Sequence, residues 1–203
     1  MNATRISLTG TGIALLLLLI AGCGSSPRSN HYLLTTDVST PPDGETPSLG
    51  IGPVVIPEFL NRNSMVYSRE GNQLEISSTE RWAEPLEAGI KRVVGINLAS
   101  SLDTQDIRYF PWNTGKPPEF GISISLLSLD AGDDEATLAA EWRVFRPATG
   151  QSVVRRISHL RLALPAGKLS ATQIAPAYSE LLSQLSDLIA GSIEQELTKS
   201  PKN

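Results

Sequence analysis

The side chain with the most distinctive chemistry in this sequence is Cys23, the only cysteine among 203 residues. A chain with one thiol forms no internal disulfide, so its folded part has to be held together by a core. The two histidines, His31 and His159, have no partners at a spacing typical of metal ligands. A lone thiol can still be alkylated, and the residues around Cys23 indicate that this is its role.

A positive charge, an apolar run and small residues precede Cys23. Arg5 is followed by the uncharged run at 13–20 (IALLLLLI), which is shorter than the roughly 20 apolar residues of a membrane-spanning helix. Its length suits the apolar region of a secretory signal, about 7 to 15 residues. Residues 19–23 (LIAGC) resemble the bacterial lipobox, so residues 1–22 are predicted to be a lipoprotein signal peptide. The alternative is an ordinary secretory signal, or a weak anchor, that ends by chance in a cysteine.

The lipobox predicts a covalent lipid anchor and no other cofactor. A diacylglyceryl group would alkylate the sulfur of Cys23, and an N-acyl chain would modify its new amino group. One acyl chain binds a membrane only marginally, and two or three make attachment stable. In lipoproteins of Gram-negative bacteria, aspartate at the next position commonly retains the protein in the inner membrane, so Gly24 favours the outer membrane. Residues 23–30 (CGSSPRSN) are the predicted lipidated start and flexible tether.

Charge and length limit the partners and the domain count. Removal of Arg5 with the signal leaves 16 of the 17 Lys and Arg side chains against 21 Asp and Glu, a net charge of −5. Scattered basic residues on an acidic chain make nucleic acid a poor partner, and an anionic membrane surface is equally unattractive. The length suits one domain, which would bury about 70% of its unfolded surface.

We predict a single α/β domain, α+β-like, at residues 31–198, followed by a polar tail at 199–203. Its sheet is mixed but mainly antiparallel, and two longer helices pack on it. Apolar and polar residues alternate over 120–126 and 138–144, which favours strands with one buried face, and a third run at 152–164 completes a predicted antiparallel meander. The other predicted strands lie at 31–34, 49–56, which is buried on both sides if central, 64–68 and 73–77, which form a hairpin, and 107–110.

The two predicted helices are amphipathic. The first covers about residues 84–101, where apolar residues recur at helical spacing and Pro85 is tolerated in the first turn. The last helix has Pro176 near its start and an apolar stripe that faces a core, although such a stripe could also bind a partner helix. The stripe consists of Tyr178, Leu181, Leu182, Leu185, Leu188, Ile189 and Ile193.

No catalytic or metal-binding motif is present in the sequence. Residues 50–52 (GIG) lack the third glycine and the helix start of a phosphate loop. The acidic turn at 130–135 does not follow the order of a calcium loop, and the zinc-hydrolase and serine-nucleophile motifs are absent. Paired glycosidase carboxylates meet only in three dimensions, so the sequence does not decide them. We therefore expect a protein that is not an enzyme, with no catalytic residues and no metal site.

Several segments of the mature sequence carry a family resemblance. They are the tether that leads to 31–34 (HYLL), then 52–62 (GPVVIPEFLNR), 81–86 (RWAEPL), and the aromatic-marked 109–112 (YFPW) and 141–144 (EWRV). In this order they resemble the PqiC-like ABC-type transport auxiliary lipoproteins, formerly a domain of unknown function. The resemblance covers essentially the whole mature chain.

The resemblance implies an α/β domain with a mixed sheet at the periplasmic face of the outer membrane. It also implies a non-catalytic role beside an MCE-domain protein, which forms a lipid conduit between the two membranes. One stretch departs from the family pattern, because Asn61-Arg62-Asn63 replaces aspartate, arginine and proline, although Arg62 keeps its long donor. Aromatic and arginine side chains dominate interface energetics. The predicted partner-binding residues are Phe59, Leu60, Arg62, Trp82, Phe110 and Trp112.

Three alternatives compete with parts of this interpretation. Trp82 and Trp142 also suit core packing, which is the commoner use of tryptophan. Trp112 lies between a proline and a polar loop, so packing and partner binding both stay open for it. The domain could itself carry a phospholipid in an apolar pocket. It could also be a scaffold for envelope assembly that binds peptidoglycan or a barrel-assembly machine. A homo-oligomeric ring would suit a symmetric conduit.

Overall fold

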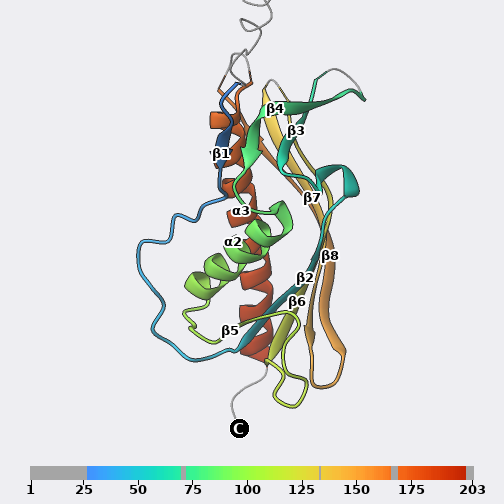
Figure 1. Cartoon of the computed structure of the whole chain (residues 1–203). Coiled ribbons are helices and arrows are strands. Elements are labelled where there is room, and N and C mark those ends of the chain that lie inside the picture. Colours follow the sequence, from blue (N-terminus) through green and yellow to red (C-terminus); the bar gives the residue numbers. More distant parts are fainter. Residues whose placement is uncertain (1–26, 70–71, 133, 166–168, 200–203) are drawn as a thin grey trace, which may run out of the picture.

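The structure is a computed structural model that describes residues 27–69, 72–132, 134–165 and 169–199. The predicted signal peptide, Cys23 and residues 200–203 of the tail lie outside these ranges. Two β-sheets and two long helices form one α+β domain, which confirms the predicted fold class (Figure 1). No helix of the described ranges is both long enough and apolar enough to cross a membrane.

The larger sheet has five strands in the order β5, β2, β6, β7 and β8. Strand β2 (Leu49–Val55) lies between β5 (Ile107–Tyr109) and β6 (Phe120–Ala131) and is parallel to both. Strands β6, β7 (Glu135–Arg146) and β8 (Gln151–Ala163) form the predicted antiparallel meander. The sheet is therefore mixed, and its three longest strands are antiparallel.

Alternation of side chains gives the larger sheet a buried face and an outer face. Ile122 pairs with Val144, and both are buried on the helix side; the next pair, Ser123 with Arg143, belongs to the outer face. Strand β2 is central in the sheet, yet its Val55 is 54% exposed. Burial of both sides of 49–56 was therefore a wrong expectation, because the outer face of the sheet is not covered at Val55.

A second, smaller sheet contains β1 (Asn30–Tyr32), β4 (Leu74–Trp82) and β3 (Ser64–Ser68), with β4 in the middle. Strands β3 and β4 form the predicted hairpin, and β1 joins β4 in parallel. The sequence predicted neither the separation into two sheets nor the length of β4, which continues to Trp82. Strand β1 ends at Tyr32, and Leu34, expected in that strand, lies in the core instead.

Helices α2 (Leu86–Ser101) and α3 (Ala171–Lys199) supply the rest of the core. Helix α3 packs on β7 and β8, and α2 packs on α3 and β2, so the helices lie on one side of the larger sheet (Figure 1). The predicted stripe of α3 is buried except at Leu188, which is 44% exposed. The prediction that Leu188 faces the core was therefore wrong, because this residue lies on the side of α3 that faces away from the core.

Candidate functional site

The structure does not bring the six predicted partner-binding residues into one patch. Leu60 and Trp82 are buried, with 3% and 5% of their surface exposed. This corrects their prediction as contact residues, because a buried side chain offers no surface to a partner. The other four lie at two places, Phe59 and Arg62 at one and the remaining pair at the other.

Trp82 belongs to the core, in agreement with the alternative that it is a packing residue. Its ring stacks on that of Tyr178 in α3, with centroids 6.1 Å apart and an interplanar angle of 27°. The hydroxyl of Tyr178 is buried without a hydrogen-bond partner among the described residues, and burial raises the pKa of Tyr178 well above its ordinary value. Trp142 is buried too, and its indole N–H donates to Ser158 Oγ at 2.9 Å. Both tryptophans hold the fold together.

Phe59 and Arg62 lie at the short 3-10 helix η1 (Glu58–Leu60), which follows β2. Phe59 is 39% exposed, and Arg62 is exposed as well. Leu60 anchors this turn in the core. Figure 1 shows the turn beside the sheet and well above β5, so Phe59 and Arg62 form a place of their own.

Phe110 and Trp112 belong to a group that we call the surface aromatic cluster: Phe110, Trp112 and Phe145. The rings of Phe110 and Trp112 are 5.3 Å apart in an edge-to-face arrangement, and those of Trp112 and Phe145 are 6.5 Å apart. The guanidinium of Arg143 lies 4.8 Å from the centre of the Phe145 ring. Cation–π and aromatic contacts of this kind fix the rings relative to each other.

Two glycines form the floor under the surface aromatic cluster. A Cβ atom on Gly50 would lie 2.8 Å from the Trp112 ring, and one on Gly121 would lie 2.5 Å from the Phe145 ring. Gly50 and Gly121 are paired across β2 and β6. The rings therefore lie directly against the backbone of the sheet, where any side chain would displace them. This close approach, and not phosphate binding, accounts for the first glycine of 50–52.

Ionic contacts brace the loop that carries Trp112. Arg108 donates from Nη2 to Asp106 Oδ2 at 2.6 Å and from Nη1 to the carbonyl of Lys116 at 2.8 Å. The bond from Arg108 lowers the pKa of Asp106, and the carboxylate raises the pKa of Arg108. Arg146 contacts Glu119 at 3.4 Å at the other end of the loop. The loop is held at both ends, so the exposed rings are presented in a fixed position.

Phe145 and Arg143 were missed by the sequence prediction. They lie in β7 at alternate positions, paired with Gly121 and Ser123, which places both on the outer face. The usable signal was the period-two alternation in 141–146, where an aromatic and an arginine occupy positions of the polar face. Their meeting with Trp112 depends on the path of the loop, which the sequence does not give.

Elsewhere the described structure offers little that resembles an active site. The residues it covers contain no group of three or more His, Cys, Asp or Glu able to hold a metal ion. A pocket of about 650 Å³ opens between β1, β4 and the start of α3, and its lining is rich in hydroxyl and carboxylate groups, including Ser77, Thr79 and Glu80. A hydrogen bond between the side chains of Tyr32 and Glu80 lowers the pKa of Glu80 and raises the pKa of Tyr32. A polar, open pocket of this kind does not favour the phospholipid-carrier alternative.

Comparisons with known proteins find relatives among transport lipoproteins. The profile of the family described as "ABC-type transport auxiliary lipoprotein component" matches residues 32–190. The intermembrane transport lipoprotein PqiC of Escherichia coli K12 is 22% identical over 198 residues, which are 93% of this chain and 97% of the relative. The PqiC of Shigella flexneri matches to the same extent.

Two crystal structures share the fold. Protein XCC0632 of Xanthomonas campestris superposes with a TM-score of 0.67 at 12% identity, over 84% of this chain and 99% of that one. An uncharacterized protein superposes with a TM-score of 0.64 at 19% identity, over 82% and 99% of the two chains.

Proposed function

The chain belongs to the family of ABC-type transport auxiliary lipoprotein components, and on that premise we propose that it is a non-catalytic part of an MCE-type intermembrane lipid transport system. Acyl chains on Cys23 hold the domain at the periplasmic face of the outer membrane. From there the domain docks the end of the MCE-domain conduit beside the leaflet. The observation that carries the proposal is the similarity to PqiC, which extends over 93% of the chain.

A short tether makes docking local. Seven peptide units separate Cys23 from Asn30, the first residue of β1, and they extend over at most about 25 Å. A receptor that a short tether keeps close to the membrane encounters a partner there at an effective concentration that often approaches millimolar. A modest intrinsic affinity is then sufficient, which suits the small exposed area of the surface aromatic cluster.

The surface aromatic cluster is the part of the described surface that best supports docking. Phe110 is 46% exposed, Trp112 is half-buried, and Arg143 lies over the adjoining Phe145 ring. Aromatic rings that are already held in place lose little conformational entropy when a partner covers them, and tryptophan and arginine are enriched among the residues that dominate binding energy. Phe59 and Arg62 at η1 are a second, separate contact in this proposal.

The anchor is tested by the substitution Cys23→Ala in the full-length chain. The variant is expected to lose its acyl chains, measured by mass spectrometry, and to move from the membrane fraction to the soluble periplasmic fraction. Ser25→Ala is the matched control and is expected to leave both unchanged. An unacylated wild-type chain with residues 1–22 still attached would contradict the proposed anchor and location together.

The partner is tested by capture of the full-length, acylated protein from detergent-solubilised membranes. We expect an MCE-domain protein to be recovered with the wild type and to be reduced about tenfold with Phe110→Ala/Trp112→Ala, because hot-spot aromatics carry most of the binding energy. Equal recovery with the double variant would contradict the assignment of the surface. Recovery of peptidoglycan or barrel-assembly proteins instead would contradict the transport role.

A further inference from the structure

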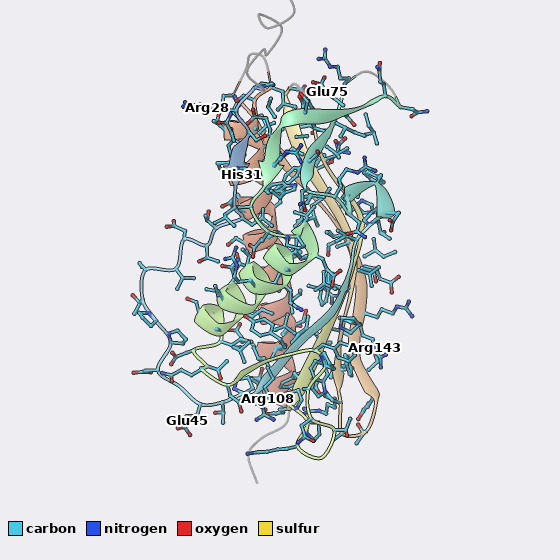
Figure 2. The ribbon with its side chains drawn as sticks, viewed as in Figure 1. Arg28, His31, Glu45, Glu75, Arg108 and Arg143 are labelled. Carbon is cyan, nitrogen blue, oxygen red and sulfur yellow. The ribbon has the colours of Figure 1, made fainter. Side chains whose placement is uncertain are left out.

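The start of the folded chain and the turn of the β3–β4 hairpin lie at the same end of the domain. Strand β1 pairs with β4 in parallel, and its first residue, Asn30, pairs with Glu80. Because parallel strands run in the same direction, the chain that precedes Asn30 lies toward the beginning of β4, where the hairpin turns. Figure 2 shows Arg28 and Glu75 at this end of the molecule and Glu45 near the other end.

The tether is too short to hold this end of the domain far from a membrane. Four peptide units separate Cys23 from Pro27, the first described residue, and they extend over at most about 14 Å. Acyl chains on Cys23 would therefore keep both the beginning of β1 and the hairpin close to the lipid headgroups. The length of the tether and the place where it ends identify a bilayer as the surface that this end meets.

The hairpin presents two apolar side chains on one of its faces. Leu74 is 42% exposed, and Ile76 is 51% exposed. They occupy alternate positions of β4, so they belong to the same face of the strand. Glu75 between them belongs to the other face, and its carboxylate accepts a hydrogen bond from the hydroxyl of Tyr67 at 2.9 Å. The outer part of the hairpin is therefore amphipathic.

Little of the described chain supports this outer part of the hairpin. Strand β1 pairs with β4 only from Glu80 to Trp82, so within the described ranges residues 74–79 have a neighbouring strand on one side alone, which is β3. Figure 1 shows the hairpin projecting from the body of the domain at the end where β1 begins. A two-stranded ribbon is only marginally stable by itself in water. A surface that covers Leu74 and Ile76 would stabilise it.

On the premise of the lipid anchor in the proposed function, we propose that Leu74 and Ile76 insert into the headgroup region of the membrane that holds the acyl chains. An amphipathic helix places its apolar face about 5–10 Å into this region, and the same burial is open to an amphipathic strand. Apolar burial drives the contact, because the charged residues that line the adjoining pocket, Arg69, Glu75 and Glu80, include both signs. A contact beside the acyl chains restricts rotation of the domain on its tether.

A fluorescent probe at the hairpin turn tests the contact in the full-length, acylated protein. Asn72→Cys adds a thiol and leaves Leu74 and Ile76 in place, and acylation blocks the only other thiol, that of Cys23. In phosphatidylcholine vesicles that contain a lipid with nitroxide-labelled acyl chains, the probe at position 72 should be quenched strongly. The same probe in Glu45→Cys, near the other end of the domain, is the control and should lose little fluorescence (Figure 2). Equal quenching at the two positions, or none at either, would overturn the proposal.

Mass spectrometry and flotation of the same vesicles separate failure of the contact from failure of the anchor. A chain that is acylated and floats with the vesicles, but whose probe at position 72 is not quenched, overturns the hairpin contact alone. A chain without acyl chains, with residues 1–22 still attached, overturns the anchor of the proposed function and the hairpin contact with it.

Removal of the two apolar side chains tests what drives the contact. Leu74→Ser/Ile76→Ser in the Asn72→Cys chain should abolish most of the quenching, because little apolar area is left to bury, while the acylated protein still floats with the vesicles. Phe110→Ser removes a side chain of similar exposure, 46%, that follows β5 in the other half of the domain, and it should leave the quenching unchanged (Figure 1). Urea unfolding checks that each variant is folded, and the comparison of positions 72 and 45 does not depend on these variants. Quenching that survives the double variant, or that needs anionic phosphatidylglycerol in the vesicles, would overturn an apolar contact.

Discussion

Two aromatic clusters with similar ring separations lie in very different surroundings. Trp82 stacks on Tyr178 at 6.1 Å between the smaller sheet and α3, and both rings are almost fully buried. Trp112 lies between Phe110 and Phe145 at 5.3 and 6.5 Å, but on the outer face of the larger sheet. The comparison teaches that ring contacts alone do not reveal the role of a tryptophan. The role depends on whether apolar side chains or solvent cover the other face of the ring.

In the core, other apolar side chains cover both rings, so removal of one leaves a cavity. On the sheet, one side of the cluster lies on the backbone of Gly50 and Gly121, and the other side faces solvent. Removal of a surface ring therefore costs little folding energy. The same ring offers apolar area that a partner can cover. The core cluster is expected to control stability, and the surface cluster is expected to control binding.

The largest expected effect is that of Trp82→Ala. Loss of a fully packed aromatic side chain should lower the free energy of unfolding by about 3–5 kcal/mol. Urea unfolding followed by circular dichroism measures the change. A loss no larger than that of Trp112→Ala would erase the difference between the two clusters.

Gly121→Ala should disturb the surface aromatic cluster from below. A Cβ at 2.5 Å from the Phe145 ring forces that ring away from the sheet, at an expected cost of about 1–3 kcal/mol. The displaced neighbours should change the fluorescence of Trp112. Gly191→Ala in α3 is the control, since nothing lies within 4 Å of its new Cβ and alanine favours a helix. Similar destabilisation by both changes would argue against a glycine floor.

Trp112→Ala should lower stability by only about 1 kcal/mol, because the ring is half-buried. The amount of MCE-domain partner that is captured should fall far more than the stability of the domain. Both quantities are measured on the same full-length preparation. A variant that loses stability but keeps its partner would move Trp112 into the structural class with Trp82.

Asp106→Asn tests the brace of the Trp112 loop and should cost up to about 1 kcal/mol, since the ion pair with Arg108 is partly exposed. The pKa of Asp106 is lowered in the folded state. Its contribution is therefore present above the ordinary aspartate pKa and is lost as the pH falls through the lowered value. Acid titration of stability should show a smaller decline for the variant than for the wild type. An unchanged acid profile would contradict the brace.

Tyr178→Phe should have the smallest effect at neutral pH, within about 0.5 kcal/mol, because it removes a buried hydroxyl that has no described partner. The pKa of Tyr178 is raised in the fold, so the neutral phenol is favoured there. Stability should then fall as the pH rises above about 10, where the unfolded phenol ionises first. The free energy of unfolding of the variant should therefore fall less at alkaline pH than that of the wild type. Tyr32, Tyr67 and Tyr109 have raised pKa values too and should supply the rest.

Local pattern was enough to predict most elements of the fold. Period-two alternation located β6 and β7, the run that follows them located β8, and helical spacing located α2 within two residues of its start at Leu86. Pairing between distant strands was not predictable in this way. Strand β4 extends to Trp82 because it pairs there with β1, some fifty residues earlier, and with the start of β3. These pairings hold Trp82 in the second sheet, where it packs on Tyr178 of α3, so the error in the fold and the error in the site have one cause.

The candidate site shows the same limit. Phe110 and Trp112 were predicted as surface residues, and the structure leaves both at least partly exposed. Phe145 and Arg143 joined them only through the path of the 110–119 loop and the register of β6 with β7. A pocket between the 33–48 loop, α2 and α3 likewise combines residues from three separate segments, including Asn97 and Asp187. No spacing in the sequence brings these together.

A photo-activated cross-linker placed at residue 112 of the full-length protein in living cells tests the central claim most directly. The account predicts that an MCE-domain protein is linked from position 112 and not from position 45, because Glu45 lies on the other side of the domain from Arg143, which covers the Phe145 ring of the cluster (Figure 2). A link to the MCE-domain protein from position 45 alone, or from neither position, would contradict the claim that the surface aromatic cluster docks the conduit.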